Sequence, residues 1–598
     1  MAKTPVNVHI GNTTFRRPWR IPEGLRALNF ISNTYPFSTK RKSSEFEKTL
    51  EKELVKREVI DSSGTTGKWT GSFARKFLNL CQHFGFITPR PKVIHGKGEY
   101  YLDSNGDDFN LINLKKDLNE NIKISLKPFS ITPLGNLLMN TESDGKELNS
   151  EQKDIFLKSL FNQIQPSILQ PYSSNYEGEK IKLIKIYIDI LLDLESRGKD
   201  KYISQGEMAG IINRYKKNNV KEIVDEILDY RNKKEGKEIN FSRKWYKEKV
   251  GSDKYFATSL DYADINFSYS VCTGLFKKRG RKVVINEDKI DIAKEISLIL
   301  VNQKQNNYEY ISNIWSGNLM PFENQKVLTK STVKIIDTLK SKYNYSGFND
   351  ESKNIDSYDS NKIKKIFFRV SDKLDERAEF QYYLAQKEKA NEILELLNNA
   401  EDKIVINDEQ IKPKPEHLEW IFWRAFLAIN SFDNPIKTTR GFPIDDDFLP
   451  THFASGGKED LIFEFETFKL IIEVTYKTGG PQFRDEHEPV FRHMINRMNE
   501  DLNKPVYCLF VAPNINNNTA RGFKDYFYNN KNEKIIANII PMEIKQFAKI
   551  FESLFITKKI LTPNKLKEIF DDTLNQKDSF EPLEWMQKIN TVVEKHVK

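Results

Sequence analysis

The chain has 598 residues, of which 38% are hydrophobic and 12% are aromatic. This length exceeds one ordinary core, so we expect two to four domains, and the apolar content excludes an intrinsically disordered protein. The longest apolar runs, VYCLFVA and IIANII, are too short to cross a bilayer, and the first residues, MAKTPVNVHIG, lack the hydrophobic region of a signal peptide. Three widely spaced cysteines, Cys81, Cys272 and Cys508, show no metal or disulfide spacing, so we expect buried thiols in a reducing cytoplasm.

The net charge of +9 is modest for this size, but its distribution is informative. Clusters of basic residues are expected of a nucleic-acid binder, and guanidinium groups suit phosphates and guanine edges. The alternative is a solvated, lysine-rich surface, which the Lys/Asn-rich stretches favour. The clusters are FRRPWR (Arg16, Arg17, Arg20), TKRKSS (Lys40, Arg41, Lys42), FARKF (Arg75, Lys76) and LFKKRGRK (Lys277, Lys278, Arg279, Arg281, Lys282).

Residues 1–150 mix helices with short strands. The stretch WTGSFARKFLNLCQHFGFI places an aromatic stripe at helical spacing, with Arg75 and Lys76 on the other flank. A turn and a strand-like GEYYLD follow, an order typical of a winged-helix DNA-recognition module. The stripe itself is core packing, so only the basic flank is a candidate for DNA contact.

Residues 151–297 form a second predicted winged-helix-like recognition module. Helices are expected at KIKLIKIYIDILLDLES and VKEIVDEILDYR, and the module ends in a hairpin with the turn KKRGRK and the return strand VVIN. A basic hairpin tip after a helix favours DNA contact, although basic tips are also common on ordinary surfaces. Residues 298–400 are charged and mostly helical, which indicates a helical linker.

Residues 401–598 show a clear order of elements. A helix, PEHLEWIFWRAFLAIN, begins at Pro415, and a two-strand unit follows at 460–477. Helix PVFRHMINRMNEDL, buried strand VYCLFVA, helix FKDYFYN, strand KIIANIIP and helix KQFAKIFESLF come next. The order α-β-β-α-β-α-β predicts a mixed sheet flanked by helices.

Two acids interrupt the two-strand unit, GGKEDLIFEFETFKLIIEVTYKTGG. Asp460 opens the first strand, and Glu473 lies within the apolar run IIEV. A turn near Thr467 sets residue 460 opposite about 474, so the acids are near neighbours, and a one-residue shift in register decides whether they share a face. Because close, buried carboxylates repel each other, the pair predicts a structural salt bridge or a divalent-metal site, with Mg²⁺ the best suited ion.

These residues carry a family resemblance. The pair D-L-I-F and E-V-T resembles the core of the PD-(D/E)XK nucleases, and the order of elements fits that fold. LEWIFWRAF, THFASGGKEDL, IIEVTYKTGGPQFRDEHEPVFRH and YCLFVAPNINNNT resemble the AlwI-like type IIS restriction and nicking endonucleases, which include the PleI, MlyI and BstNBI group. The match is dense from about 415 to 550, weaker at VCTGLFKKRG and thin in the first module.

The resemblance implies a metal-binding pair at Asp460 and Glu473, with the backbone carbonyl of Val474 as a further ligand. It also implies Mg²⁺, with Mn²⁺ as a substitute. The Lys position of the motif is Thr475 here, which leaves open the group that orients the attacking water, and Lys477 is a candidate.

Three further residues match family positions. Glu419 corresponds to an acid that helps to hold a second metal or its water, Glu486 to a later active-site Glu, and His493 to a His that contacts phosphate or water. Alternatively, Glu419 is an ordinary exposed helix residue and His493 a packed or surface one. Asp485 and Glu488 are alternatives to Glu486 for the family position. Any of the three acids could instead simply stabilise the N-terminus of the next helix.

The predicted architecture is therefore multidomain, α/β and α+β, with winged-helix-like modules at 1–150 and 151–297, a helical linker at 298–400 and a PD-(D/E)XK endonuclease domain at 401–598. The resemblance implies a bacterial or archaeal enzyme that binds a short asymmetric site in double-stranded DNA and cuts a few base pairs away. It also implies a cognate DNA methyltransferase and, for double-strand cleavage, a transient homodimer or a small second catalytic subunit; no membrane partner is expected. The alternatives are a repair or recombination nuclease of the same core and a non-catalytic DNA-binding regulator.

Overall fold

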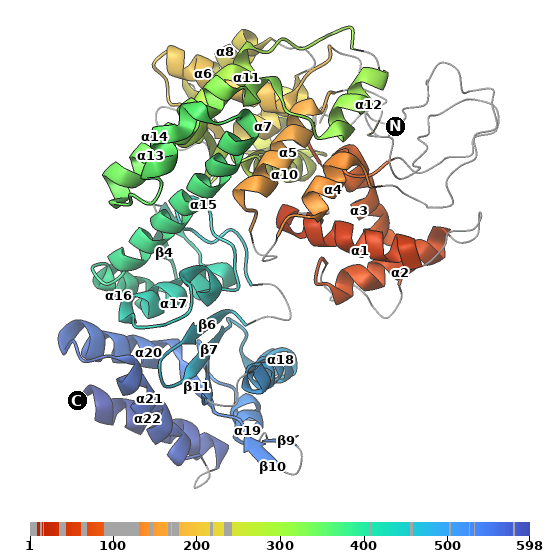
Figure 1. Cartoon of the computed structure of the whole chain (residues 1–598). Helices are drawn as coiled ribbons and strands as arrows, with labels where there is room; N and C mark the ends of the chain where they lie inside the picture. Colours follow the sequence, from red (N-terminus) through yellow and green to blue (C-terminus); the bar gives the residue numbers. More distant parts are fainter. Residues whose placement is uncertain are drawn as a thin grey trace. The chain divides into compact units, whose positions relative to one another are not determined.

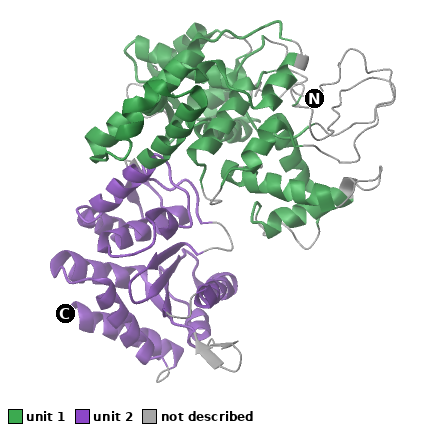
Figure 2. Ribbon diagram, viewed as in Figure 1, with its two compact units in different colours: residues 1–374 green, residues 375–598 purple. Residues whose placement is uncertain are grey.

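In the computed structural model, the chain forms two compact units, residues 1–374 and 375–598, which are coloured separately in Figure 2. The structure describes residues 9–11, 15, 17–34, 43–60, 69–88, 131–142, 147–165, 169, 179–215, 219–232, 242–305, 307–406, 409–454, 459–500, 504–525, 527–530, 533–577 and 581–598. No helix in these ranges is both long enough and apolar enough to span a membrane.

Unit 1 is mostly helical, with one small sheet among its described residues (Figure 1). Its helices before the sheet hairpin are η1 (Pro18–Arg20), α1 (Ile21–Thr34), α2 (Ser43–Lys56), α3 (Ser72–His83), α4 (Pro133–Met139), α5 (Ser150–Asn162), α6 (Leu183–Ser196), α7 (Gln205–Gly210), η4 (Ile212–Arg214), α8 (Val220–Asn232), α9 (Arg243–Val250) and α10 (Phe256–Cys272). Those after it are η5 (Glu287–Lys289), α11 (Ile290–Leu298), α12 (Asn307–Ser316), η6 (Pro321–Glu323), α13 (Gln325–Tyr343), α14 (Asn349–Asn354), η7 (Ile355–Ser357) and α15 (Ser360–Ala385), which runs past the unit boundary.

The aromatic stripe predicted in the first module forms α3 and lies mainly in the core. Phe77, Leu80 and Phe84 are fully buried in the hydrophobic core of unit 1. Phe73, one turn earlier, is half-buried, and Arg75 is exposed on the opposite side, as the helical spacing predicts. The interpretation of the stripe as core packing is therefore confirmed, whereas the predicted strand GEYYLD lies outside the described residues.

The predicted basic hairpin is present as β2 (Phe276–Arg279) and β3 (Lys282–Ile285), which pair antiparallel. Arg279 pairs with Lys282, so Gly280 and Arg281 form a two-residue turn, and Gly280 adopts a φ of 57°. Glycine tolerates a positive φ without steric cost, and such turns match the twist of the strands. A short strand, β1 (Ile203–Ser204), pairs with β3 and gives the order β1-β3-β2.

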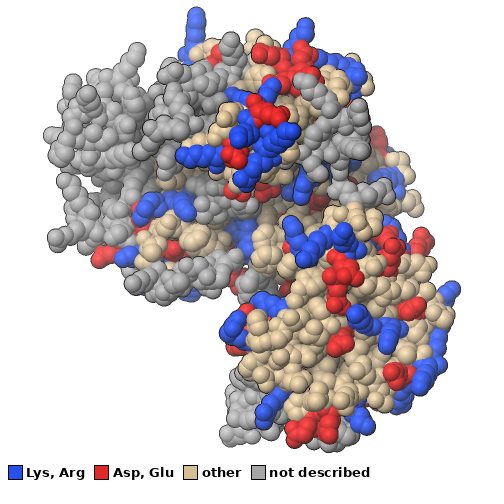
Figure 3. Space-filling model, turned by 180° about the vertical axis from the view of Figure 1, so that it is seen from behind, with Lys and Arg blue, Asp and Glu red and all other residues tan. Residues whose placement is uncertain are grey.

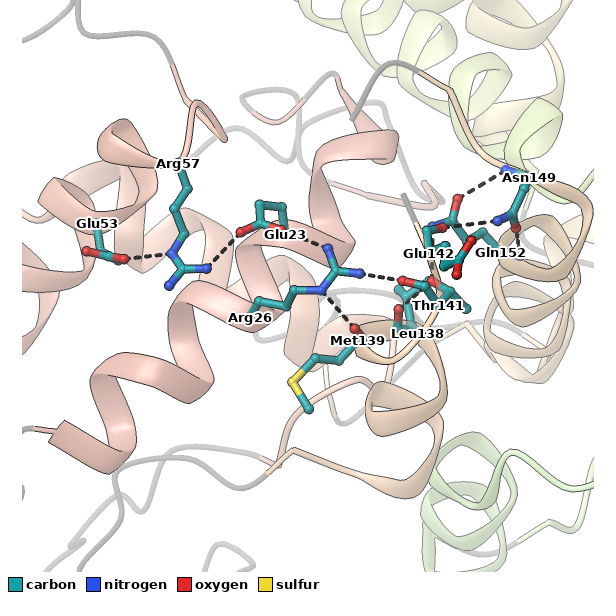
Figure 4. A network of polar contacts seen from close by, with 10 residues as sticks. All are labelled: Glu23, Arg26, Glu53, Arg57, Leu138, Met139, Thr141, Glu142, Asn149 and Gln152. Carbon is teal, nitrogen blue, oxygen red and sulfur yellow. Dashed lines mark hydrogen bonds and ion pairs between the residues drawn. The ribbon is translucent and has the colours of Figure 1, made fainter. Parts of the chain in front are cut away.

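Two arginines of unit 1 join its N-terminal helices in a polar network (Figure 4). Arg57 binds Glu23 and Glu53 at 2.8 and 2.6 Å. Arg26 also binds Glu23, at 2.7 Å, and donates to the carbonyl oxygens of Met139, at 3.0 Å, and Thr141. These guanidinium groups connect α1, α2 and the end of α4, so they serve the fold of unit 1.

Unit 2 contains a four-stranded mixed sheet in the order β11-β8-β7-β6. β6 and β7 pair antiparallel, whereas β7–β8 and β8–β11 are parallel. The strands are β4 (Ile404–Ile406), β5 (Glu409–Ile411), β6 (Leu461–Glu464), β7 (Lys469–Val474), β8 (Val506–Ala512), β9 (Phe527–Asn530), β10 (Glu533–Ile536) and β11 (Ile539–Glu543). The helices are α16 (Ala390–Asn398), α17 (Pro415–Ile429), η8 (Ile436–Thr439), α18 (Gly479–Glu500), α19 (Asn517–Asp525), α20 (Ile544–Ile550), the π-helical η9 (Phe551–Thr557), α21 (Pro563–Asn575) and α22 (Pro582–Val597).

Each face of this sheet packs on its own group of helices. Leu470 and Ile472 of β7 lie in a core shared with α17 and α20–α22, whereas Ile471 lies in a second core with Val490 and Met494 of α18. Figure 1 shows α18 and α19 on one side of the strands and α20 to α22 on the other. Since successive strand residues point to opposite faces, Glu473 belongs to the α18 side together with Ile471.

The sequence predicted the order of these elements but not all of their bounds. Helix α17 begins at Pro415, as expected, and β8 matches VYCLFVA. Helix α18 begins ten residues earlier than Pro489, which lies inside the helix. Proline is costly there because it removes a backbone donor, which is why the sequence favoured a start at this residue. The predicted helix FKDYFYN is wrong in its second half, where α19 ends at Asp525 and β9 begins at Phe527.

The observed class is thus mixed α/β, mostly helical with small sheets. The helical character of residues 298–400 agrees with the prediction, and α13 buries Ile335, Ile336 and Leu339 in the core of unit 1. The compact units divide the chain between residues 374 and 375. The finer division into two recognition modules, a linker and a nuclease domain remains a prediction.

Candidate functional site

Asp460 and Glu473 lie on the same face of the β6–β7 hairpin. Leu461 pairs with Ile472, so the register continued by one residue sets Asp460 opposite Glu473, one position from the predicted partner. Leu461 and Ile472 both point into the core on the α17 side, so the two acids both point to the α18 side. The question of register left open by the sequence is answered by this pairing.

The Asp460 carboxylate is held by the backbone and not by a basic side chain. Its Oδ2 accepts a hydrogen bond of 2.8 Å from the backbone N–H of Val474. Burial raises the pKa of Asp460 well above its usual range, and the neighbouring carboxylate of Glu473 raises it further, whereas the Val474 N–H opposes the shift. Among the described residues, no Lys or Arg forms an ion pair with Asp460, so its charge lacks a compensating cation.

Glu473 is buried and contacts a histidine from the helix packed on this face. Its Oε1 lies 2.7 Å from Nδ1 of His493, on α18. An ionised Glu473 accepts this hydrogen bond from Nδ1–H, whereas a protonated Glu473 donates it to Nδ1. Burial raises the pKa of Glu473 well above its usual range, with further upward shifts from Glu459 and Glu486, and burial lowers the pKa of His493.

A third acid of the hairpin provides an internal comparison. Glu459, next to Asp460, is buried and forms an ion pair with Arg497 of α18. Burial alone would raise the pKa of Glu459, but the Arg497 guanidinium outweighs it and lowers this pKa. Glu459 is therefore a structural ion-pair residue, whereas Asp460 and Glu473 have raised pKa values and no such partner among the described residues.

Glu419 is a buried residue of α17, so the alternative of an exposed helix position is wrong. Its Oε2 accepts a 2.8 Å hydrogen bond from the backbone N–H of Ala454. Burial raises the pKa of Glu419 well above its usual range, and the charges of Asp460 and Glu473 add to this shift. These electrostatic effects show that Glu419 lies near the two hairpin acids.

Glu486, in the first half of α18, is held by two residues that follow β7. Oε1 of Glu486 accepts a 3.2 Å hydrogen bond from the Thr475 hydroxyl and lies 2.9 Å from Nζ of Lys477. Lys477 also lies 3.5 Å from Asp485. Burial opposes the charged form of Lys477, but the hydrogen bonds and charges of Glu486 and Asp485 together outweigh burial and raise its pKa. Because α18 starts early, Glu486 lies inside the helix and does not precede it.

The donor set of this site suits a hard divalent cation. Glu419, Asp460 and Glu473 offer carboxylate oxygens whose mutual repulsion a cation would relieve, and oxygen ligands are those that Mg²⁺ prefers. In the ranges that the structure describes, however, no three or more His, Cys, Asp or Glu side chains converge as a ready-made metal site. A cation here would thus rest on the hairpin pair together with a backbone carbonyl or water.

Sequence reasoning missed the contacts that hold these acids. The backbone N–H groups of Ala454 and Val474 and the Glu459–Arg497 ion pair join segments far apart in the chain. Gln482 has a similar role, since its side chain donates to the carbonyls of Lys477 and Asn514, both at 2.9 Å. No spacing of residues in the sequence predicts such contacts.

The basic residues predicted to contact DNA lie in unit 1 and differ in exposure. Arg20 is buried, 3.9 Å from Glu58, and Arg75 is exposed but forms an ion pair of 3.0 Å with Glu47. Lys76 lies over the ring of Phe73, and Arg17 is half-buried. Arg16, Lys40, Arg41 and Lys42 lie outside the described residues.

The hairpin cluster is the more accessible of the described basic clusters. Arg279 and Arg281 are exposed at the turn, while Lys277 and Lys278 are half-buried, 3.9 Å from Asp288 and 3.8 Å from Asp264. On the face drawn in Figure 3, basic and acidic side chains are interspersed over both units. Clustering in the sequence is therefore not enough to define a basic surface, and individual residues must be compared.

Comparison with known proteins gives the family. The model of the AlwI restriction endonuclease family matches residues 116–550, which is well over half of the chain. A solved structure, the small subunit of the heterodimeric restriction endonuclease R.BspD6I, matches at 26% identity over 35% of this chain and 100% of that one, with a TM-score of 0.28. A search of curated proteins found no match.

The chain is thus a restriction endonuclease by class, a nuclease that acts at specific sites in DNA. It belongs to the AlwI restriction endonuclease family. The resemblance seen in the motifs of unit 2 is confirmed, and the family match extends into unit 1.

Proposed function

We propose that this protein is a type IIS restriction or nicking endonuclease that binds a short asymmetric site in double-stranded DNA. It hydrolyses a phosphodiester a few base pairs outside that site with Mg²⁺, for which Mn²⁺ can substitute. Unit 2 would carry the cleavage site, in a PD-(D/E)XK-like core. The order α17-β6-β7-α18-β8, with acids at the end of the β6–β7 hairpin, supports this assignment.

One observation carries the proposal. Asp460 and Glu473 share a face of the hairpin, and burial and mutual repulsion raise the pKa of Asp460, yet no described Lys or Arg pairs with either. A structural salt bridge, the alternative reading of the two acids, would need such a partner. Glu459 has one in Arg497, and its pKa is lowered accordingly. The hairpin pair has the electrostatics of a cation site and not of an ion pair.

The roles of individual residues follow from their contacts. Asp460 and Glu473 would hold the ion with the carbonyl of Val474, and Glu419 would hold a second ion or its water. A bound Mg²⁺ would supply an activated water and stabilise charge on the phosphate. His493 would keep Glu473 oriented through Nδ1, and Glu486, fixed by Thr475 and Lys477, would orient the water from the other side.

Recognition would fall to unit 1. Helix α10 is followed by the hairpin β2–β3 with its basic turn, and the earlier strand β1 completes a three-stranded antiparallel sheet, which supports a winged-helix-like module. Phosphate contacts would position the duplex, while arginine forks read bases in the major groove. Arg279 and Arg281, at the exposed turn, are the described arginines best placed for this role.

One catalytic site cuts one strand. A double-strand break would need a second site, from a transient homodimer or a small partner subunit, whereas a nicking enzyme would need neither. A cognate DNA methyltransferase would protect the host sites. Run-off sequencing of cleaved genomic DNA would give the site, the offset and the strand preference together.

The decisive test is the variant Asp460→Ala. The native protein should nick or linearise plasmid DNA only with Mg²⁺ or a similar ion, and Asp460→Ala should abolish cutting while site-specific binding persists. Full cleavage by this variant would refute the assignment. Two rival functions are distinguished by companion assays: a preference for branched over linear duplex would indicate a repair or recombination nuclease, and failure to bind Mn²⁺ would indicate a non-catalytic regulator.

A further inference from the structure

Helix α9 is an unpredicted element that packs against the helix preceding the basic hairpin. Its N-cap, Ser242, accepts a 3.1 Å hydrogen bond from the Trp245 N–H, and Gly251 ends it in the left-handed region. Tyr246 is fully buried, and its hydroxyl lies 2.6 Å from that of Ser259 on α10. The ring of Trp245 lies 4.6 Å from that of Tyr230 on α8, so α9 has a fixed orientation.

That orientation directs two lysines into solvent. Adjacent helical residues are separated by about 100°, so the direction opposite the packed pair, half-buried Trp245 and buried Tyr246, falls between Lys244 and Lys247. Both lysines are exposed. They lie three residues apart and therefore neighbour each other on one face.

These two lysines also differ from the other basic residues of α9 in their partners. Arg243 lies 3.7 Å from Asp253, and Lys249 lies 2.6 Å from Glu226. Within the described part of the chain, neither Lys244 nor Lys247 has an ion pair. Their charges are thus available to an anionic partner, and α9 directs both to the same side.

The family of the protein indicates the kind of partner for these lysines. On α10, Ser259 contacts α9, and Asp264 lies 3.8 Å from Lys278 of the hairpin. Helix α10 therefore contacts both α9 and strand β2 of the hairpin that carries Arg279 and Arg281 at its turn. Since the protein is a restriction endonuclease, the anionic polymer that it must hold is double-stranded DNA.

We infer that α9 is a DNA-backbone contact, in which Lys244 and Lys247 bind phosphates beside the segment contacted by α10 and the hairpin. The inference rests on the proposed recognition role of unit 1 and adds to it a surface outside the predicted basic clusters. Such contacts hold the duplex in register without reading sequence. They also make affinity depend on salt. Removal of one phosphate contact reduces the magnitude of the slope of log K against log salt by about 0.9.

The test is a binding titration of the full-length protein in EDTA, where no cleavage should occur. A fluorescein-labelled duplex carrying the site found by run-off sequencing is compared with a scrambled duplex, at a series of NaCl concentrations. The variant Lys244→Ala/Lys247→Ala should bind both duplexes on the order of 10- to 100-fold more weakly at 0.1 M salt, with a slope reduced by about 1.8. The pair Lys244→Arg/Lys247→Arg should bind like the native protein.

The matched control is Lys326→Ala/Lys365→Ala, which removes the same charge from two exposed lysines of α13 and α15. If the control lowers affinity and slope as much as the α9 variant, the effect is one of net charge and the inference is overturned. An unchanged slope for the α9 variant would also overturn it. If the native protein binds neither duplex, the recognition role itself fails, which separates that outcome from the failure of α9.

Discussion

The imidazole Nδ1 of His493 lies 2.7 Å from Oε1 of Glu473, and both groups are buried. This contact joins α18 to the end of β7 and fixes the carboxylate that the proposed cation would bind. Nε2 of His493 is also buried and has no hydrogen-bond partner among the described residues. The histidine is thus placed to hold Glu473 in position.

We expect His493→Ala to slow single-turnover cleavage by 10- to 100-fold, the range typical of lost partners of metal ligands. His493→Asn should retain more activity, because its amide can donate from a position near that of Nδ1. DNA affinity in EDTA should be unchanged in both variants. Asn496→Ala, at an exposed position of the same helix, is the control, and equal losses in the Ala and Asn variants would contradict a positioning role.

The raised pKa values of the acids predict how pH and Mg²⁺ affect stability. Asp460, Glu473 and Glu419 have pKa values well above the ordinary range of a carboxyl group, about 4. Above that pH the unfolded chain releases these protons before the folded chain does. Stability from these groups is therefore full below about pH 4 and is lost as pH rises through the raised values.

In EDTA, the contribution of these acids to Tm should accordingly decrease as pH rises. Mg²⁺ should counter this decrease by binding the ionised carboxylates. The increase in Tm on adding Mg²⁺ should be larger at pH 8 than at pH 6. Asp460→Asn should reduce both the pH dependence and the effect of Mg²⁺. An increase in Tm of equal size at both pH values would indicate that the cation does not bind these acids.

How far the sequence predicts this site can be judged from individual residues. Short continuous runs of apolar residues and the position of Pro415 suffice for β6, β7, β8 and the start of α17, because these signals are local. The placement of Asp460 opposite Glu473 was predicted to within one residue. In contrast, the contacts of Glu419 with Ala454 and of Glu459 with Arg497 join segments 35 and 38 residues apart, and only the folded chain brings them together.

Helix α9 was missed for a different reason. Its sequence, RKWYKEKV, is short and charged, and its three apolar residues, Trp245, Tyr246 and Val250, are too few to define a helical pattern. A helix of eight residues is marginal without tertiary packing, which here comes from Tyr246 and Trp245.

Thr475 occupies the position of the motif lysine, and its hydroxyl shares Glu486 with Lys477. Lys477 is nearly half exposed, so solvent screens its ion pair, which is worth at most about 1 kcal/mol. Lys477→Met should therefore slow single-turnover cleavage by up to about fivefold, with a smaller difference from the native protein at high salt. Lys477→Arg should restore the rate, and a loss that is independent of salt would argue against the ion pair as its cause.

Because Thr475 is buried, Thr475→Val should have an effect that salt does not alter. Loss of one hydrogen bond costs about 1 kcal/mol, or roughly fivefold in rate if Glu486 acts in the transition state. The double variant tests whether both residues act through Glu486, since their effects should then not be additive. Additive losses would place the two residues in separate roles.

Two buried histidines of unit 1 should make its stability depend on pH in the direction opposite to that of the acids of unit 2. Burial lowers the pKa of His9 to about 4, although its hydrogen bond with the Gly11 carbonyl opposes the shift, and burial lowers that of His83 to about 3. Between their ordinary pKa of 6.5 and these values the unfolded chain binds more protons than the folded one. Stability from these groups is thus present above pH 6.5 and is lost as pH falls toward 4.

Calorimetry between pH 7 and 4 should therefore show an acid-labile transition, and each histidine can contribute up to about 1.4 kcal/mol per pH unit. His83→Leu removes one titrating group, so this variant should lose less stability between pH 6.5 and 4 than the native protein, even if it is less stable at pH 7. His452→Asn, in unit 2, should leave the acid dependence of that transition unchanged. If His83→Leu keeps the native acid dependence, the lability of unit 1 arises from its carboxylates and not from its buried imidazoles.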